Sequence, residues 1–590
     1  MRMKKSRYIF LSMLAILSLV SCQNEAGNDG SLTYVNASDP GTATIRIFKN
    51  DNSSDPKGRY VSPTNAKIDL TYESISGTLS NNRTVCPSNG DVNLLVIPVH
   101  IPGSEEYKTD KVKEDIDAMF FGENNDKLGF KSVKEFYMES SYGKLNFSGK
   151  VTDWYDSAKS NIKSAADITR GQDGTIVKIL EDACSWAINE QKINLQEFDK
   201  NRDGAIDAVW LVYDHLDYTT ESKKLLKDGK VNEASAVNQS YWNFTGWDYN
   251  LELADYEKNK DAQPAPSGFS WASFDMMYTS YCKQESFTYG SMKYDLPVWD
   301  ESTKLDSHTF IHETGHLLGL DDYYATDATS YNPAGETTMM DQNVYDLDSY
   351  SKMLLGWVKP YVVYGSSEIV LPKATSSDRA VIVIPSNYED ISKSVSRFYS
   401  REDNKDKKFS YTFNPFSEYL MIDLYSPDGL NKQDVYGTYI NGRESLGEMT
   451  RTGVRIYHVD SRIFKCIVKN TDNGQKFYYD QDDLTWNGEQ LANDEAIFMP
   501  ISNDKTGAEA FQLSTSYDPF DRIRLLEATQ NNTFSYGGHA SDDTLFNVDS
   551  KEFSIEDFGY SFFNSNYSFN DGNNLPFKVK VNTLKEIEND

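Results

Sequence analysis

The stretch HETGHLLGLDDYY, residues 312–324, decides how the central part of this chain is interpreted. The chain has 590 residues and only seven histidines, yet His308, His312 and His316 fall close together. Residues four apart on an α-helix lie one turn above each other, so His312 and His316 project from the same face. Two imidazoles placed in this way can reach a single tetrahedral cation.

The residues around the two histidines complete a zinc-site pattern. Glu313 lies beside the imidazole face, where its carboxylate can hold and deprotonate a metal-bound water. Gly319 can end the helix in the left-handed conformation and turn the chain back toward the metal. Asp322 then arrives as the third ligand, and Asp321 is the alternative. The sequence therefore predicts a zinc site formed by His312, His316 and Asp322.

A structural interpretation of the same helix also has to be considered. Its apolar residues could form a core face with incidental histidines; they are Phe310, Ile311, Leu317, Leu318 and Leu320. The Gly and Asp spacing after HETGH argues against that reading. His308, one turn earlier, is either a further imidazole near the metal or a residue that supports the site from the helix N-terminus.

A second acidic motif, FDKNRDGAIDAVWLVYD at 198–214, resembles part of a calcium loop. The alternating ligand positions are Asp199, Asn201, Asp203, the carbonyl of Ala205, and Asp207. Gly204 takes the place of the sharp turn, but Trp210 stands where a bidentate glutamate is expected. We predict a structural calcium whose remaining ligands come from elsewhere, with a plain acidic turn as the alternative.

The first residues, MRMKKSRYIFLSMLAILSLVSC, have the pattern of an export signal. A basic head precedes an apolar run that is too short for a permanent membrane span. The run closes with Leu-Val-Ser-Cys at 19–22, which resembles the lipobox of bacterial lipoproteins. We expect a signal peptide at 1–21, lipidation of Cys22, and localisation of the exported protein at the cell envelope or cell surface.

Charge and cysteine content narrow the classes of partner. A formal net charge of −30 disfavours binding to nucleic acid and to anionic lipid heads. We therefore expect no nucleic-acid partner, membrane contact through the N-terminal lipid only, and a monomer. The other cysteines, Cys86, Cys184, Cys282 and Cys466, form no CxxC pair. They could form up to two disulfides or remain buried thiols.

The predicted organisation is α+β and multidomain. Residues 22–90 alternate polar and apolar and suggest a tether followed by a small β domain or pro-region. Residues 91–360 mix strands and helices and form the predicted catalytic domain. Residues 361–590 consist mostly of short strands and turns, which suggests one or two β-sandwich-like units.

Several segments together resemble the immune inhibitor A family of secreted zinc metallopeptidases. The resemblance runs from about 91 to 462 and rests on these stretches: SVKEFYMESSYGKLNFSGKVTDWY (132–155), DKNRDGAIDAVWLVYD (199–214), HETGHLLGLDDYYATD (312–327), DSYSKMLLGWVKP (348–360), SEYLMIDLYSP (417–427) and TRTGVRIYHVDSR (450–462). The third stretch is similar to the family's HExxHxxGxxD motif. The resemblance implies a zincin-like catalytic domain of metzincin type.

The resemblance also implies residue roles. His312, His316 and Asp322 would be the zinc ligands, Glu313 the general base, and Met340 in ETTMMDQN the methionine of the turn beneath the metal. The sequence departs from the family where Glu336-Thr337-Thr338 replaces a tryptophan-containing stretch. Tyr345 is either an oxyanion helper or a core aromatic, and His458 and Asp460 are interpreted as structural.

The predicted function is that of a lipid-anchored zinc metalloendopeptidase that acts on extracellular proteins or peptides. The expected cofactors are one catalytic zinc ion and a structural calcium ion. The alternative is a non-catalytic surface lipoprotein that binds proteins or glycans on a metallopeptidase-like scaffold. The presence of Glu313 favours the enzyme, because a binding scaffold would not need a general base.

Overall fold

The computed structural model describes residues 36–49, 58–63, 84–325, 331–385, 416–437 and 449–461, together with shorter stretches between 463 and 586. Residues 34–590 cluster as one compact unit. Within the described residues, no helix is long and apolar enough to cross a membrane. The predicted signal peptide and Cys22 lie outside the described residues.

A mostly parallel sheet forms the framework around helix α7 (His308–Leu317). Its strand order is β4-β3-β6-β8-β7, and β5 also pairs with β3. The strands are β3 (Gly90–His100), β4 (Leu145–Val151), β5 (Tyr155–Asp156), β6 (Val209–Tyr213), β7 (Phe244–Trp247) and β8 (Gly268–Ser273). All pairs are parallel except β7 with β8. The antiparallel strand β7 therefore forms one edge of the sheet.

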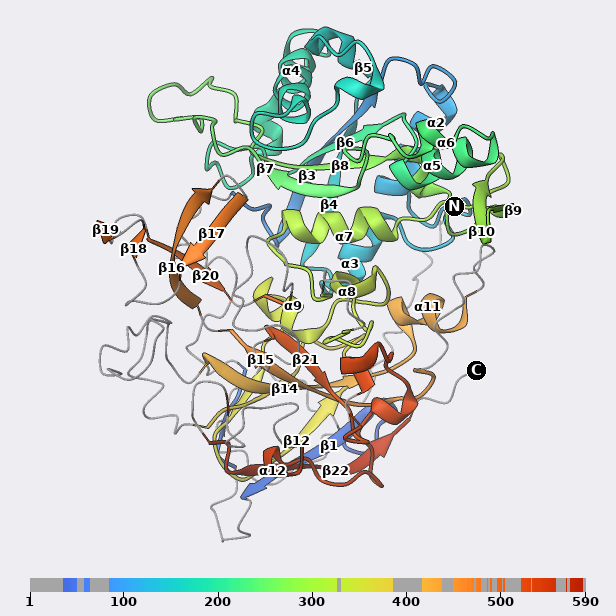
Figure 1. Ribbon diagram of the computed structural model, residues 1–590. Coiled ribbons are helices and arrows are strands. Elements are labelled where there is room, and N and C mark those ends of the chain that lie inside the picture. The colour runs from blue at the N-terminus through green and yellow to red at the C-terminus, as the bar shows by residue number, and fades with distance from the viewer. Residues whose placement is uncertain are drawn as a thin grey trace, which may run out of the picture. The chain divides into compact units, whose positions relative to one another are not determined.

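Helices cover both faces of this sheet (Figure 1). On β3, Leu95, Ile97 and Val99 join the core cluster that includes α4 (Thr175–Asn189). The alternate residues of β3 face the cluster formed with α2 (Asp110–Phe121), α3 (Val133–Ser140) and α7 (His308–Leu317). Burial on both faces explains why DVNLLVIPVHI is almost continuously apolar, since parallel strands covered by helices have no solvent face.

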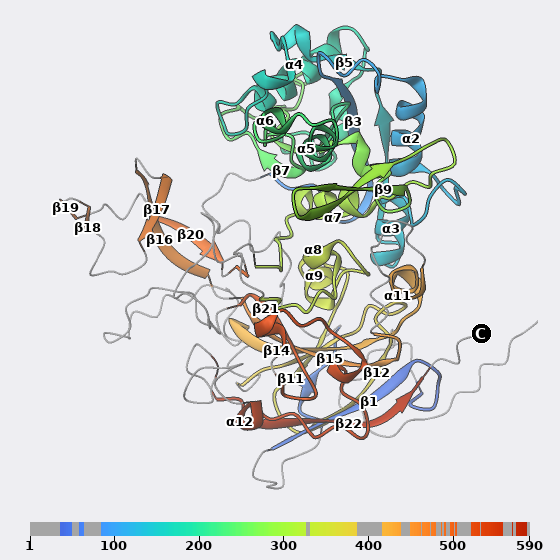
Figure 2. The same ribbon diagram turned by 45° about the vertical axis from the view of Figure 1, so that its right-hand side comes forward.

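The helices begin at side-chain caps that the sequence supplies. Thr109 accepts a hydrogen bond from the amide of Val112 and caps α2. Ser132 and Glu135 form a reciprocal capping box at the start of α3. The other helices are α5 (Tyr218–Lys227), α6 (Val231–Ala234), α8 (Met339–Gln342), α9 (Ser349–Leu354), α11 (Lys432–Tyr436) and α12 (Ile555–Phe558). Figures 1 and 2 both show α7 between the parallel sheet and the short helices α8 and α9.

A second sheet lies on the far side of α8 and α9 (Figure 2). Its order is β2-β11-β13-β14-β15-β21, with bounds β2 (Tyr60–Val61), β11 (Tyr361–Val363), β13 (Val381–Val383), β14 (Glu418–Tyr425), β15 (Gly453–Asp460) and β21 (Ile523–Leu526). Residues of β14 alternate between two buried clusters: Leu420 and Ile422 face one, and Tyr419 and Met421 face the other. The second of these clusters includes residues of α7 and Met340, so this sheet shares a core with α7.

The opposite face of that sheet packs on a three-stranded sheet. Its order is β12-β1-β22, formed by β12 (Ser367–Pro372), β1 (Thr42–Lys49) and β22 (Phe577–Lys585). Ala43, Ile45 and Ile47 of β1 join Leu420 and Ile422 in one buried cluster. The N-terminal strand is therefore the middle strand of a sheet whose neighbours come from the C-terminal region.

The remaining described strands form small ribbons. They are the hairpin β9 (Lys283–Tyr289) and β10 (Met292–Val298), the group β16 (Ile463–Thr471), β17 (Gly474–Tyr478) and β20 (Ala496–Pro500), and the pair β18 (Thr485–Trp486) and β19 (Glu489–Gln490). The described fold is mixed α/β. The domain boundaries at 90 and 360 stay predictions.

Candidate metal centre

Helix α7 carries the two histidines and is held in place by core packing and by hydrogen bonds of Thr314. Phe310, Ile311 and Leu317 are buried in the core. The Thr314 hydroxyl donates to the carbonyl of Phe310 at 2.7 Å and receives the indole N–H of Trp210 at 3.2 Å. The apolar face of the helix is therefore a core face, as the structural interpretation requires, while the histidines lie on a different part of its surface.

The turn after α7 brings Asp322 back to the helix. Gly319 has φ of +98°, the left-handed conformation that the sequence predicts for it. Its amide donates to the carbonyl of His316 at 2.8 Å, and the amide of Leu320 donates to that of Gly315 at 3.0 Å. These bonds close the C-terminus of the helix and reverse the chain direction.

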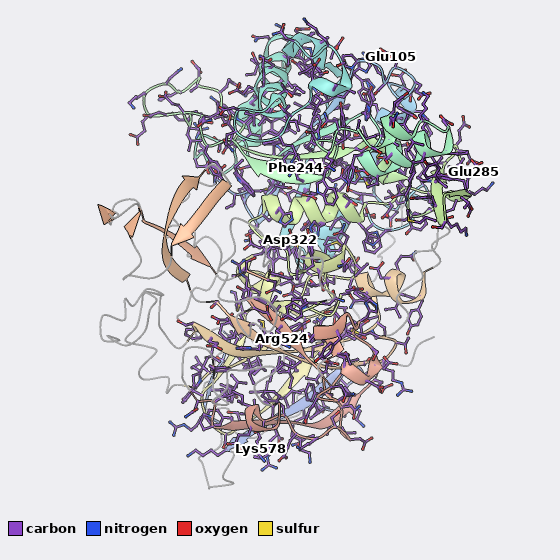
Figure 3. All side chains as sticks on the ribbon, viewed as in Figure 1. Glu105, Phe244, Glu285, Asp322, Arg524 and Lys578 are labelled. Carbon is purple, nitrogen blue, oxygen red and sulfur yellow. The ribbon has the colours of Figure 1, made fainter. Side chains whose placement is uncertain are left out.

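Three ligand atoms meet at this point. The Nε2 atoms of His312 and His316 are 3.1 Å apart. Oδ1 of Asp322 lies 3.0 Å from Nε2 of His312 and 3.2 Å from Nε2 of His316. A tetrahedral zinc with ligands at 2.0–2.1 Å would separate them by about 3.3–3.4 Å. Among the described residues, these three side chains form the group of His, Cys, Asp and Glu residues whose ligand atoms lie close enough together to hold a metal ion. Figure 3 labels Asp322 beside α7.

The outer nitrogens of both imidazoles are held by backbone carbonyls. Nδ1 of His312 lies 2.8 Å from the carbonyl of Met339, and Nδ1 of His316 lies 2.8 Å from that of Leu320. A carbonyl can only accept, so each Nδ1 carries the proton and each Nε2 has a free lone pair. Both imidazoles therefore direct a metal-binding lone pair at the same point, which fits a zinc ion.

Acidic side chains make this point strongly negative. Burial opposes protonation of His316, but the carboxylates of Asp322 and Glu313 outweigh it and raise the pKa of His316 to about 10. Burial acts against ionisation of Asp322, yet His316 and His312 lower the pKa of its carboxyl well below the usual range. The same negative charge that favours an imidazolium here would favour a divalent cation.

Glu313 is held by a residue of the sheet edge. The Thr245 hydroxyl, on β7, lies 2.8 Å from Oε2 of Glu313 and 3.0 Å from its backbone carbonyl. It also lies 2.8 Å from the hydroxyl of Ser270 on β8. The Glu313 side chain is buried beside the histidine pair. Thr245 thus fixes the carboxylate of Glu313, whose negative charge acts on His316.

Met340 packs directly beneath the histidine pair. It is fully buried, and a Cβ placed on Gly315, one residue before His316, would come within 2.5 Å of its sulfur. Only glycine at 315 leaves room for this contact. The amide of Tyr323 donates to the carbonyl of Met340 at 2.8 Å, which joins the methionine segment to the Asp322 loop.

His308 lies at the N-terminus of α7 and is buried. Its Nδ1 is 2.5 Å from Asp306, its Nε2 is 3.3 Å from Asp434 of α11, and its ring stacks on Phe130 at 4.1 Å. Burial alone would lower the pKa of His308, but the two carboxylates raise it to about 9. His308 therefore supports the helix N-terminus as an imidazolium between two aspartates.

Three other residues considered from the sequence have different surroundings. Asp321, the alternative ligand, forms an ion pair with Arg522. Tyr345 is buried in a small cluster with Val344 and Val435, and its amide donates to Asp434 at 2.5 Å. This is the packing of a core aromatic, so its oxyanion role stays a prediction. His458 is buried and contacts Glu418 at 2.7 Å within the second sheet.

The acidic loop at 199–207 is closed by its own hydrogen bonds. Asp199 accepts the amides of Asp203 and Gly204, each at 3.1 Å, and the hydroxyl of Tyr256 at 2.5 Å. Asp203 accepts the amide of Ala205 at 2.9 Å and the side-chain amide of Asn201 at 3.0 Å. Burial, together with the neighbouring carboxylates, raises the pKa of Asp207 to about 7. Calcium binding in this loop stays a prediction.

The described cysteines are buried free thiols: Cys86, Cys184 and Cys282. Cys466 lies in β16, outside the residues whose side chains are described. Burial raises the pKa of Cys184 to about 12, which leaves its thiol protonated and inert at neutral pH. For these three residues, the thiol alternative of the sequence analysis holds in the structure.

Sequence reasoning missed Thr245 and Arg170. Thr245 is 68 positions from Glu313 along the chain and belongs to no motif. Arg170 stacks on Phe244, the residue before Thr245, at 4.2 Å. Neither residue has a local pattern that marks it, since both are brought to the site by the pairing of β7 with β8 and by the loop before α4.

Comparison with known proteins gives one family. Residues 91–217 match the model of the immune inhibitor A peptidase M6 catalytic domain. The match begins in β3 and includes the acidic loop, and it ends before α7. No curated protein matches the chain. The matched residues include β3, β4, β5 and β6 of the parallel sheet, whereas β7, β8 and the His312, His316 and Asp322 group lie beyond the match. Residues 91–217 are therefore similar to the catalytic domain of the immune inhibitor A metallopeptidases.

Proposed function

We propose that the protein is an exported zinc metalloendopeptidase that hydrolyses peptide bonds of extracellular proteins. The observation that carries this proposal is the convergence of three ligand atoms, from His312, His316 and Asp322, at mutual distances of 3.0–3.2 Å. Glu313, on the same helix, adds the carboxylate that hydrolysis needs. The membership of residues 91–217 in a peptidase family supports protein substrates.

In the proposed mechanism His312, His316 and Asp322 hold the zinc ion. When bound, zinc supplies a Lewis acid that polarises the scissile carbonyl and lowers the pKa of a bound water. Glu313 takes the proton of the attacking water on its carboxylate and delivers it to the leaving amine. Thr245 orients this carboxylate by its hydrogen bond to Oε2. The edge strand β7, beside Glu313, offers backbone groups with which an extended peptide can pair.

We further propose export and anchoring through a lipid on Cys22. The support is the basic head, the short apolar run and the Leu-Val-Ser-Cys sequence. Metabolic labelling with a radioactive fatty acid should mark the wild-type protein and leave Cys22→Ser unlabelled. Labelling of the Cys22→Ser variant would refute lipidation at this cysteine.

The proposed activity is tested by measuring zinc and hydrolysis together. Zinc content and casein hydrolysis, with and without a chelator, are compared for the wild type and Glu313→Gln. We expect near-equimolar zinc in both proteins and a loss of rate on the order of 10²–10⁴-fold in Glu313→Gln, because only the proton transfer is removed. Full activity in the variant, or hydrolysis that resists the chelator, would refute the mechanism.

A further inference from the structure

We propose that Arg170 forms a carboxylate-binding subsite at the edge strand beside the zinc site, which selects substrates with an acidic side chain near the scissile bond. This inference rests on the proposed peptidase function and adds a substrate class to it. Three features of Arg170 support it: the fixed loop that carries this residue, the stacking of its guanidinium on Phe244, and the absence of an ion pair with a described carboxylate.

The loop before α4 is fastened along β7. Gln172 donates to the carbonyl of Trp247 at 2.6 Å and accepts the amide of Tyr249 at 3.2 Å. Two hydrogen bonds between Thr169 and Thr175 close the loop. The amide of Thr169 donates to the hydroxyl of Thr175 at 2.8 Å, and the amide of Thr175 donates to the hydroxyl of Thr169 at 2.9 Å. Because both ends of the loop are fixed, Arg170 has a defined position over the first residue of the strand.

The guanidinium of Arg170 is held flat against an aromatic ring. Its Cζ lies 4.2 Å from the ring centre of Phe244, within the range of a cation–π contact. Thr245, the next residue, contacts the carboxylate of Glu313. Figure 3 labels Phe244 and Asp322, both close to α7. The positive charge therefore lies one strand position from the residue that orients the general base.

Successive residues of β7 point to opposite faces of the sheet. Thr245 faces α7, while Phe244 packs against the cluster that contains α4. An extended peptide paired with β7 would alternate in the same way, with one set of side chains toward the zinc site and the other toward Arg170. The subsite would thus bind a substrate side chain that points away from the metal.

Arg170 is exposed and, within the described part of the chain, forms no ion pair. Burial of part of the guanidinium lowers the pKa of Arg170, and the charge of Glu313 acts in the opposite direction. Guanidinium prefers carboxylates, which it binds through two parallel hydrogen bonds. A substrate Asp or Glu fits this unused donor set.

The test uses matched peptides that are acetylated at one end and amidated at the other. Each peptide carries Glu or Gln at one of the positions flanking the scissile bond, and kcat/KM is measured for wild type, Arg170→Gln and Arg170→Glu. Arg46→Gln is the control, because Arg46 also stacks on a phenylalanine of a strand, Phe48, at 4.9 Å. Chelator-sensitive cleavage of the Gln peptides reports the peptidase activity separately.

We expect a Glu peptide to be cleaved about tenfold better than its Gln partner at one position or more, and this ratio to fall to near one in Arg170→Gln. Arg170→Glu should lower the ratio of Glu to Gln cleavage below one, and Arg46→Gln should keep the wild-type ratio. A ratio that is unchanged in Arg170→Gln, with Gln peptides still cleaved, would overturn the subsite alone. Absence of cleavage of every peptide by the wild type would overturn both the subsite and the peptidase function.

Discussion

Thr245 illustrates how a single residue of the sheet can position the proposed general base, Glu313. Its hydroxyl reaches both Oε2 and the backbone carbonyl of Glu313. Groups that orient residues of a metal site from outside are typically worth 10–100-fold in activity. Thr245 is therefore a positioning residue, because it acts on the reaction through Glu313.

Replacing Thr245 with valine should lower kcat about tenfold and change KM little, since the methyl group keeps the volume and removes the hydrogen bond. Thr245→Ser retains the hydroxyl and should recover most of kcat. Steady-state kinetics on one peptide substrate measure both variants. Equal loss in the serine and valine variants would show that packing, and not the hydroxyl, is what matters at this position.

Residues of the zinc site differ in how far the sequence could predict them. His312, Glu313, His316 and Asp322 lie within eleven positions, so helix periodicity and one glycine turn suffice to bring them together. Thr245 and Arg170 reach the site through strand pairing and a loop contact, which no local periodicity specifies. The surroundings of Tyr345 likewise depend on α11, 89 positions away.

Helix α7 is tied at its N-terminus to an element of the C-terminal region. His308 lies between Asp306 of the preceding turn and Asp434 of α11, and Phe130 covers its ring. A cation buried between two carboxylates contributes to stability only while it is protonated. The junction between α7 and α11 should therefore depend on pH.

The stabilisation by His308 should be lost in alkaline solution. The pKa of His308 is about 9 in the folded protein and about 6.5 in the unfolded chain. The contribution is complete below pH 6.5, on the order of 3 kcal/mol, and disappears as pH rises through 9. The free energy of unfolding of the wild type should exceed that of His308→Gln at pH 6, and this difference should shrink as the pH rises to 10. Denaturant titrations across this pH range measure both free energies. A difference independent of pH would contradict the buried imidazolium.

Across the whole molecule, the N-terminal strand β1 joins regions that are distant in sequence. It pairs with β12 and with β22, and its apolar face contacts the second sheet, whose other face packs in the cluster that contains α7. The alternation in TATIRIFK predicted a strand, but its partners are more than 300 positions away and could not be predicted from local pattern. Integration of β1 in this sheet argues that it contributes to the stability of the folded enzyme.

Ile45→Ala should destabilise the protein as a whole. Ile45 is fully buried between the two sheets, and truncation of such a residue costs about 2–5 kcal/mol. Arg46→Ala on the exposed face of the same strand should cost less than about 1 kcal/mol. Both values come from denaturant unfolding, and thermal loss of peptidase activity should follow the same order. Unchanged stability in Ile45→Ala would mean that β1 is dispensable for the fold.

We propose that Asp322, and not its neighbour Asp321, completes a zinc site with His312 and His316. The most direct measurement is the zinc content per chain of the wild type, Asp322→Asn and Asp321→Asn after dialysis against metal-free buffer. We expect one zinc per chain in the wild type and in Asp321→Asn, because Asp321 pairs with Arg522 and does not bind the metal, and loss of zinc in Asp322→Asn. Zinc retained by Asp322→Asn and lost by Asp321→Asn would contradict this proposal.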